Sequence, residues 1–260
     1  MVAANITPDE IVIGDWTQIV TLAVENDLAP MLYFRLFQFG LLEQLDLRNR
    51  TIVDNEVRAT ALRNAIFERE QQRISEAMAA ASIPLLWLKG LPIAQELYPQ
   101  PDCRPMVDLD LLIPESRRAD AADLMDQLGY RFDPDDEFQL VAGNRALANK
   151  IGHHDVYRQT FGIGGRIEIH YRIGTLRGVP QTMNATDWIW QQTVTTEDGT
   201  LRLQSEALLL YLCAHIALQH GDQNVGLKHY LDIHLLVTNI PIDWKFLIEQ
   251  AVRLHCATAV

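Results

Sequence analysis

Two aspartates, Asp108 and Asp110, lie two residues apart in the otherwise apolar run 107–113. In a β-strand, residues i and i+2 point to the same face, so the two carboxylates would project side by side. Adjacent negative charges on a half-buried strand are costly unless a cation neutralises them, and Mg²⁺ prefers oxygen ligands of this kind. An isolated Asp-x-Asp pair is more often two solvated aspartates at a strand end or turn, so the interpretation depends on the flanking sequence.

A second polar pair has the same spacing. Glu168 and His170 lie two apart in the apolar segment 167–171, so they would also share one face of a strand. If the two strands are neighbours, three carboxylates converge, and this is the ligand set expected for two-metal phosphoryl or nucleotidyl transfer. His170 is a further candidate metal ligand or base, although a histidine on a strand more often has a structural hydrogen-bonding role.

A candidate phosphate site precedes the aspartates. The apolar segment 83–88 predicts a buried strand that ends in Lys89-Gly90 and leads into a helix through Tyr98. The unpaired N–H groups and positive dipole of a helix N-terminus suit a phosphate, which Gly90 would let approach closely while Lys89 adds charge. The alternative is a plain strand–helix turn with a surface lysine.

Other polar residues also have two interpretations. Arg104, in the loop before the aspartates, could contact a phosphate bidentately or form a salt bridge with Asp102 or Asp108. The polar residues of a predicted helix over 225–237, Asp232 among them, could line a substrate pocket or form hydrogen bonds between helices. For that helix, the structural role is the stronger expectation.

The hydrophobic pattern predicts an α+β fold: a small mixed β-sheet with helices, flanked by N- and C-terminal helical segments. Helices are expected over 15–26, 30–39, 53–81, 116–128, 205–220, 225–237 and 243–255, and strands over 83–88, 107–113, 130–132, 154–160 and 166–171, the last two joined by a turn at 162–165. The buried stripe of the third helix is expected at Val57, Ala61, Ala65, Ile74 and Met78.

The same pattern divides the chain into three parts. We expect an N-terminal helical domain over 1–81, a core over 82–175 and a C-terminal helical domain over 176–260. The last predicted helix has no Gly or Pro stop after it, which leaves room for that domain to continue beyond the sequence given.

The composition favours a globular protein and argues against one that binds nucleic acid or membranes through its overall charge. The 260 residues are 48% hydrophobic, enough for a substantial core, and the formal charge of −12 gives no overall attraction to nucleic acid or anionic membranes. The three cysteines lack a C-x-x-C spacing and are typical of free thiols in a reducing compartment. No signal peptide or membrane-spanning run is evident, so a cytoplasmic protein is expected.

Taken together, these motifs resemble the DNA polymerase β-like nucleotidyltransferase superfamily. More closely, the chain resembles an uncharacterised bacterial nucleotidyltransferase family with an L-K-G turn, an R-x-x-D-[IL]-D-[IL]-L strand and a later E-I-H-[WY] strand. Here the corresponding elements are Leu88-Lys89-Gly90, the segment 104–112, in which three residues rather than two separate Arg104 from Asp108, and Glu168-Ile169-His170-Tyr171. The chain departs from the superfamily at the phosphate turn, where Gly-Ser or Gly-Gly is usual.

The resemblance implies an enzyme that uses Mg²⁺ or Mn²⁺ to move a nucleoside monophosphate from a nucleoside triphosphate, ATP first, to an unknown acceptor. It implies that Asp108, Asp110 and Glu168 hold metal and act in catalysis, and that Lys89, Gly90 and Arg104 hold the nucleotide. The acceptor would be a small molecule, a protein or a peptide, with RNA disfavoured by the charge. The alternatives are an inactive nucleotide- or partner-binding module of the same fold and a toxin–antitoxin component.

Overall fold

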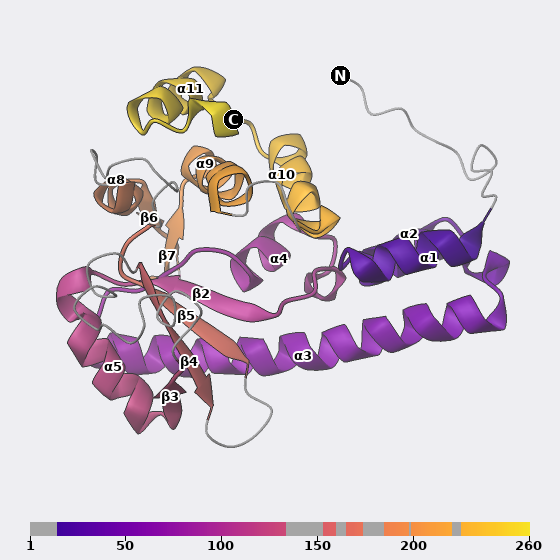
Figure 1. Ribbon diagram of the computed structural model, residues 1–260, viewed down its shortest axis with the longest axis horizontal. Helices are drawn as coiled ribbons and strands as arrows, with labels where there is room; N and C mark the ends of the chain where they lie inside the picture. The colour runs from indigo at the N-terminus through magenta and orange to yellow at the C-terminus, as the bar shows by residue number, and fades with distance from the viewer. Residues whose placement is uncertain (1–14, 134–152, 160–164, 174–184, 198, 220–224) are drawn as a thin grey trace, which may run out of the picture.

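The computed structural model describes residues 15–133, 153–159, 165–173, 185–197, 199–219 and 225–260. In this part of the chain, a five-stranded sheet lies between helices on both faces (Figure 1). The predicted α+β class is therefore confirmed. No helix in the described ranges is both long enough and apolar enough to cross a lipid bilayer.

In the described residues before the sheet, the chain forms three helices and one 3-10 turn. They are α1 (Trp16–Glu25), α2 (Ala29–Gln38), the 3-10 turn η2 (Leu42–Gln44) and α3 (Leu47–Ala80). The predicted cap Asp15 accepts hydrogen bonds from the backbone N–H groups of Thr17 and Gln18. Asp46 likewise caps α3 by accepting from the N–H of Asn49. Because side-chain acceptors at this position stabilise the first turn, α3 begins at Leu47 rather than at residue 53 as predicted.

The buried stripe of α3 differs in part from the prediction. Ile74 and Met78 are buried as expected, but Ala65 is exposed, and Asn64 and Phe67 are buried instead. Asn64 is tolerated there because its amide nitrogen donates to two backbone carbonyls of the 101–104 turn, at 3.3 and 3.0 Å. The polar residue thus ties α3 to the loop before the aspartates, a role that periodicity alone does not indicate.

The central sheet has the strand order β1-β2-β5-β4-β3. The strands are β1 (Leu86–Trp87), β2 (Asp108–Leu112), β3 (Tyr130–Phe132), β4 (His154–Gln159) and β5 (Arg166–His170). β2 and β5 pair in parallel, and the other neighbours pair antiparallel. The two strands that carry the polar pairs are therefore adjacent, as the convergence of their carboxylates requires. The turn predicted at 162–165 lies outside the described residues except for Gly165.

Alternation along β2 and β5 gives the sheet two different faces. Leu109, Leu111, Ile167 and Ile169 belong to a core formed with α3 and α5 (Arg118–Gln127). Leu112 belongs instead to a core formed with α4 (Leu91–Leu97) and the C-terminal helices. Figure 1 shows α3 and α5 on one side of the sheet and α4, α9 and α10 on the other. The aspartates thus face the C-terminal helices.

The described part of the C-terminal third contains helices and a hairpin. Its elements are α8 (Ala185–Gln191), β6 (Thr193–Thr195), β7 (Leu201–Leu203), α9 (Ser205–Ala214), the π-helix η5 (His215–Gln219), α10 (Leu227–Asn239) and α11 (Trp244–Arg253). Short 3-10 turns occur at Pro101–Cys103, Glu115–Arg117 and Ala257–Ala259. The antiparallel β6–β7 hairpin was not predicted, because strands of three residues carry too little alternation to detect. The end of the helix predicted over 205–220 lies outside the described residues.

Candidate active site

The register between β2 and β5 brings the predicted polar residues together. Asp110 pairs with Glu168, and Leu112 pairs with His170, so the side chains at these positions lie on one face. One ligand atom from each of Asp110, Glu168 and His170 lies within 4.8 Å of the other two. Asp108 shares the face, two residues before Asp110, but its carboxylate is outside this set of three.

Asp110 is at the centre of the group and is 1% exposed. Its Oδ1 lies 3.3 Å from Nζ of Lys89 and 3.3 Å from Nε2 of His170. Its Oδ2 is buried without a hydrogen-bond partner. Because a buried carboxylate oxygen without a partner is unfavourable, a cation that contacted Oδ2 would remove this cost.

The two aspartates have pKa values that move in opposite directions. Burial acts to raise the pKa of Asp110, but the charges of Lys89 and His170 outweigh it and hold that pKa well below its usual range. For Asp108, burial and the neighbouring charge of Asp110 raise the pKa to about 6. Two like charges in one site separate in this way because ionisation of one disfavours ionisation of the other. In the absence of a metal, Asp110 is therefore the permanent anion.

Glu168 and His170 also interact directly. Nε2 of His170 lies 3.6 Å from Oε2 of Glu168, and Nε of Arg166 lies 2.9 Å from Oε1. Burial acts to raise the pKa of Glu168, but its contact with the His170 imidazole lowers it overall. Burial acts to lower the pKa of His170, but its contacts with Asp110 and Glu168 raise it overall. The imidazole therefore supplies positive charge between the two carboxylates.

Lys89 is buried, which argues against the alternative of a plain turn with a surface lysine. Besides Asp110, its Nζ lies 3.2 Å from Nε2 of His215, the first residue of η5. Burial acts to lower the pKa of Lys89, but the negative charges of Asp110 and Asp108 raise it overall. Single-turn π-helices inside longer helices are common at functional sites, and here the turn carries a side chain to the cluster. Sequence reasoning did not identify His215.

Gly90 has a backbone conformation that other residues rarely adopt. Its φ is +83° and its ψ is −118°, and it is the residue before α4. A Cβ there would lie 3.6 Å from Sδ of Met106, an ordinary contact, so conformation rather than space requires glycine. The turn therefore aims Lys89 at the carboxylates while the chain reverses into α4.

Arg104 lies in a buried ion pair rather than at an open surface. Its Nε and Nη2 donate to the two carboxylate oxygens of Asp232 on α10, at 2.8 and 2.7 Å. The hydroxyl of Tyr98 donates to the same Asp232 at 2.7 Å. This geometry agrees with the salt-bridge alternative, but the partner is Asp232 rather than Asp102 or Asp108. The same contacts agree with the structural role expected for Asp232, since they join α10 to the loop before β2.

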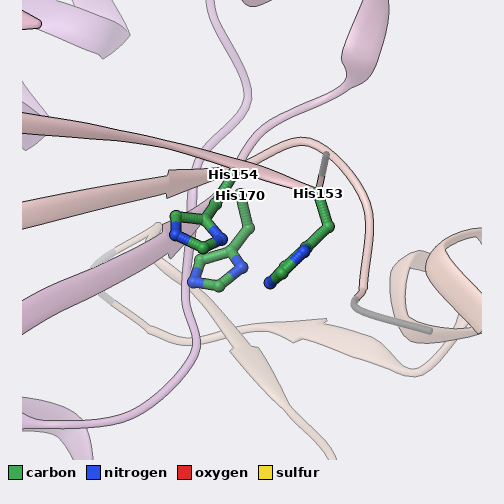
Figure 2. Close-up of side chains that lie close together, drawn as sticks. All are labelled: His153, His154 and His170. Carbon is green, nitrogen blue, oxygen red and sulfur yellow. The ribbon is translucent and has the colours of Figure 1, made fainter. Parts of the chain in front are cut away.

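Two histidines next to the site were not among the predicted residues. His154 pairs with His170 across β4 and β5, and His153 precedes it. Figure 2 shows the rings of all three grouped together. The sequence held one indication of this grouping. The strands predicted over 154–160 and 166–171 form a hairpin, and a hairpin brings its two outer ends together. The register that sets His154 opposite His170 could not be read from the sequence.

The donor set fits a divalent cation. Asp110 offers an oxygen without a partner, Glu168 offers a second carboxylate, and Asp108 provides a third on the same face. Oxygen donors of this type suit Mg²⁺ or Mn²⁺, while the His170 nitrogen suits Mn²⁺ better than Mg²⁺. The described residues can therefore hold a metal once Lys89 and His170 yield part of their contact with Asp110.

Comparison with known proteins gives the class of the chain. A sequence profile described as "Uncharacterised nucleotidyltransferase" matches residues 14–260. The chain belongs to this family. The family resemblance inferred from the L-K-G, D-x-D and E-I-H motifs is thereby confirmed, and nucleotidyltransferase is the class of the protein.

Two solved structures are similar to this member of the family. One is described as the solution structure of the antibiotic-resistance factor ANT(2'')-Ia, with 14% identity, a TM-score of 0.47, and coverage of 76% of this chain and 95% of that chain. The other is a crystal structure of ANT(2'')-Ia in complex with adenylyl-2''-tobramycin, with 16% identity, a TM-score of 0.44, and coverage of 71% and 95%. No curated protein sequence matches this chain.

Proposed function

We propose that this protein is a metal-dependent nucleotidyltransferase that moves a nucleoside monophosphate from a nucleoside triphosphate to an acceptor. The observation that carries the proposal is the parallel register of β2 and β5, which sets Asp110 opposite Glu168 on the face that Asp108 shares. Paired carboxylates on adjacent strands are a usual ligand set for phosphoryl transfer with two metal ions. Membership of the nucleotidyltransferase family supports the reaction class.

Each residue has a role in the proposed reaction. Asp108 and Asp110 would hold the divalent ions, Mg²⁺ or Mn²⁺, and Glu168 would help hold one ion and accept the proton of the acceptor group. Bound ions supply charge neutralisation at the reacting phosphate and favour an in-line attack. A bond forms between the acceptor nucleophile and the α-phosphorus, the bond from that phosphorus to the β-phosphate oxygen breaks, and pyrophosphate leaves.

Lys89 and Gly90 would hold the triphosphate, with ATP as the first candidate. Lys89 already faces the carboxylates, so binding of metal and nucleotide would let it exchange Asp110 for a phosphate oxygen. Arg104 would contribute by holding the loop before β2 rather than by touching phosphate, because its guanidinium is engaged with Asp232. The acceptor would be a small molecule, a protein or a peptide, since a charge of −12 disfavours RNA.

One observation favours a second candidate, a nucleotide- or partner-binding module without catalysis. Lys89 and His170 both contact Oδ1 of Asp110, so the chain itself neutralises the carboxylate that a metal would need. A site that has lost its metal would be stabilised by such internal cations. Retention of Asp108, Asp110 and Glu168 together argues against this candidate.

Transfer of label separates the two candidates. The protein would be incubated with Mg²⁺ or Mn²⁺ and each nucleoside triphosphate labelled at the α-phosphate, with and without cell extract. We expect label on a product with the parent and with Asp123→Asn, a control at an exposed aspartate on α5, and no labelled product with Asp110→Asn. Nucleotide binding without transfer in any extract would instead support the binding module.

A further inference from the structure

We propose that His153, His154 and His170 form a binding site for a transition metal ion of the Zn²⁺ type, next to the carboxylates. One ring nitrogen from each histidine lies within 4.8 Å of those of the other two. Figure 2 shows the three rings lying close together near the ends of the paired strands. The proposal concerns metal binding alone and does not depend on whether the protein transfers nucleotides.

Strand pairing and backbone hydrogen bonds position these three histidines. His154 and His170 are direct partners in the antiparallel ladder of β4 and β5, where opposite side chains on one face are nearest neighbours. The carbonyl of His153 accepts hydrogen bonds from the backbone N–H groups of Tyr171 and Arg172, at 3.0 and 3.1 Å. His154 at the start of β4 and His153 just before it are therefore held against the end of β5.

The chemistry of the donors selects the type of ion. Three imidazoles suit Zn²⁺, Co²⁺, Ni²⁺ or Cu²⁺, whereas Mg²⁺ prefers oxygen. Zn–N bonds of about 2.0–2.1 Å place tetrahedral ligand nitrogens roughly 3.3 Å apart, so small side-chain rotations would close the present group. The ring centroids are already 4.3, 5.1 and 5.8 Å apart.

The surroundings also suit a metal. His153 is partly exposed, whereas both ring nitrogens of His154 and the side chain of His170 are buried, so most of the ligand atoms lie away from solvent. Nε2 of His170 lies 3.3 Å from Asp110 and 3.6 Å from Glu168. Carboxylates next to a ligating histidine orient its ring and increase its basicity, which strengthens metal binding. His170 thus belongs both to this group and to the carboxylate set.

Cobalt titration tests the site directly. Co²⁺ would be added to the full chain at about pH 8, because the ion competes with protons for the imidazole nitrogens and a higher pH favours the ion, and visible absorption would report nitrogen ligation and geometry. We expect saturable binding to the parent, and at least a tenfold weaker affinity for His153→Ala and for His154→Ala, since each removes a ligand. His234→Ala, at an exposed histidine of α10, should bind Co²⁺ like the parent.

A second comparison locates the ion. Asp110→Asn should keep the Co²⁺ absorption bands with a modest loss of affinity, because the imidazole ligands remain. If Asp110→Asn abolishes the bands while His153→Ala and His154→Ala leave them unchanged, the ion binds the carboxylates and the three-histidine site is wrong. Thermal unfolding of each variant without metal would verify that it is folded. Failure of nucleotidyl transfer in a separate assay would leave these outcomes unaffected.

Discussion

Lys89 and Asp110 form a buried ion pair, with Nζ 3.3 Å from Oδ1, at the carboxylate that the motifs predict as a metal ligand. The pair joins the end of the β1 segment to β2, and His170 contacts the same oxygen. A buried carboxylate needs positive charge whether or not a metal is present. The protein therefore carries its own counter-ions, which a divalent ion would have to compete with.

Removal of the lysine charge should destabilise the metal-free protein. Lys89→Met keeps most of the apolar stem but leaves Asp110 with His170 as its main cation, and breaking such a buried pair typically costs about 3–5 kcal/mol. Added Mg²⁺ or Mn²⁺ should then raise the melting temperature more for the variant than for the parent, because the metal replaces the missing charge. Thermal unfolding with and without metal measures both effects. If metal raised the melting temperatures of the two proteins equally, Lys89 and the metal would not compete for Asp110.

The pKa of Asp108 predicts a dependence of stability on pH. In the folded chain this pKa is raised to about 6 from its ordinary value of 3.8. Between these values the folded chain binds more protons than the unfolded chain, so the contribution of Asp108 to the free energy of unfolding decreases as the pH rises and stays low above about pH 6. The opposite shift of Asp110 is present in both proteins and largely cancels in a comparison with Asp108→Asn.

Without metal, Asp108→Asn should therefore be more stable than the parent at neutral pH, by about 1–3 kcal/mol. The difference should shrink as the pH falls toward 4, where the parent aspartate is protonated in the folded state. Urea unfolding at a series of pH values measures the difference. Added Mg²⁺ should stabilise the parent more than the variant, because the variant lacks a metal ligand, and so it should reduce the stability advantage of the variant. A constant difference across the whole pH range would rule out the titration of Asp108 as its cause.

Substitution of Arg104 should affect folding more than nucleotide binding. Arg104→Lys cannot reproduce the two parallel hydrogen bonds to Asp232, so we expect a loss of about 2–4 kcal/mol in the free energy of unfolding. Under conditions where the variant is fully folded, its nucleotide dissociation constant should match that of the parent. Urea unfolding and nucleotide titration give the two quantities. A large change in nucleotide affinity with unchanged stability would return Arg104 to the phosphate-binding role predicted from sequence.

The turn at Gly90 should be sensitive to any side chain. Gly90→Ala forces an L-residue into a conformation with φ of +83°, which typically costs about 1–3 kcal/mol. Gly226→Ala is a matched control, because Gly226 precedes α10 with a φ of −64° and its added Cβ would make ordinary contacts. Melting temperatures of the two variants decide the point. If they fall equally, the strain at Gly90 is absent or is relieved by local movement.

The local features of this protein follow from its sequence. Alternation places Asp108 and Asp110 on one face because the side-chain period of a strand is two, and Asp15 caps α1 because its oxygen accepts from nearby N–H groups. The mixed sheet between residues 82 and 171 follows from the same periodicity. The motifs also identified the nucleotidyltransferase family, which the match over residues 14–260 confirmed.

The contacts that define the site depend on tertiary structure. The parallel register that sets Asp110 opposite Glu168 is fixed by how the helices cover the sheet, and neither strand encodes the position of its partner. Arg104 meets Asp232, 128 residues away, and Lys89 meets His215, 126 residues away, because the C-terminal helices pack on the acidic face. A periodic pattern records which face of an element is buried, but the partner of a buried charge is decided only when distant segments pack together.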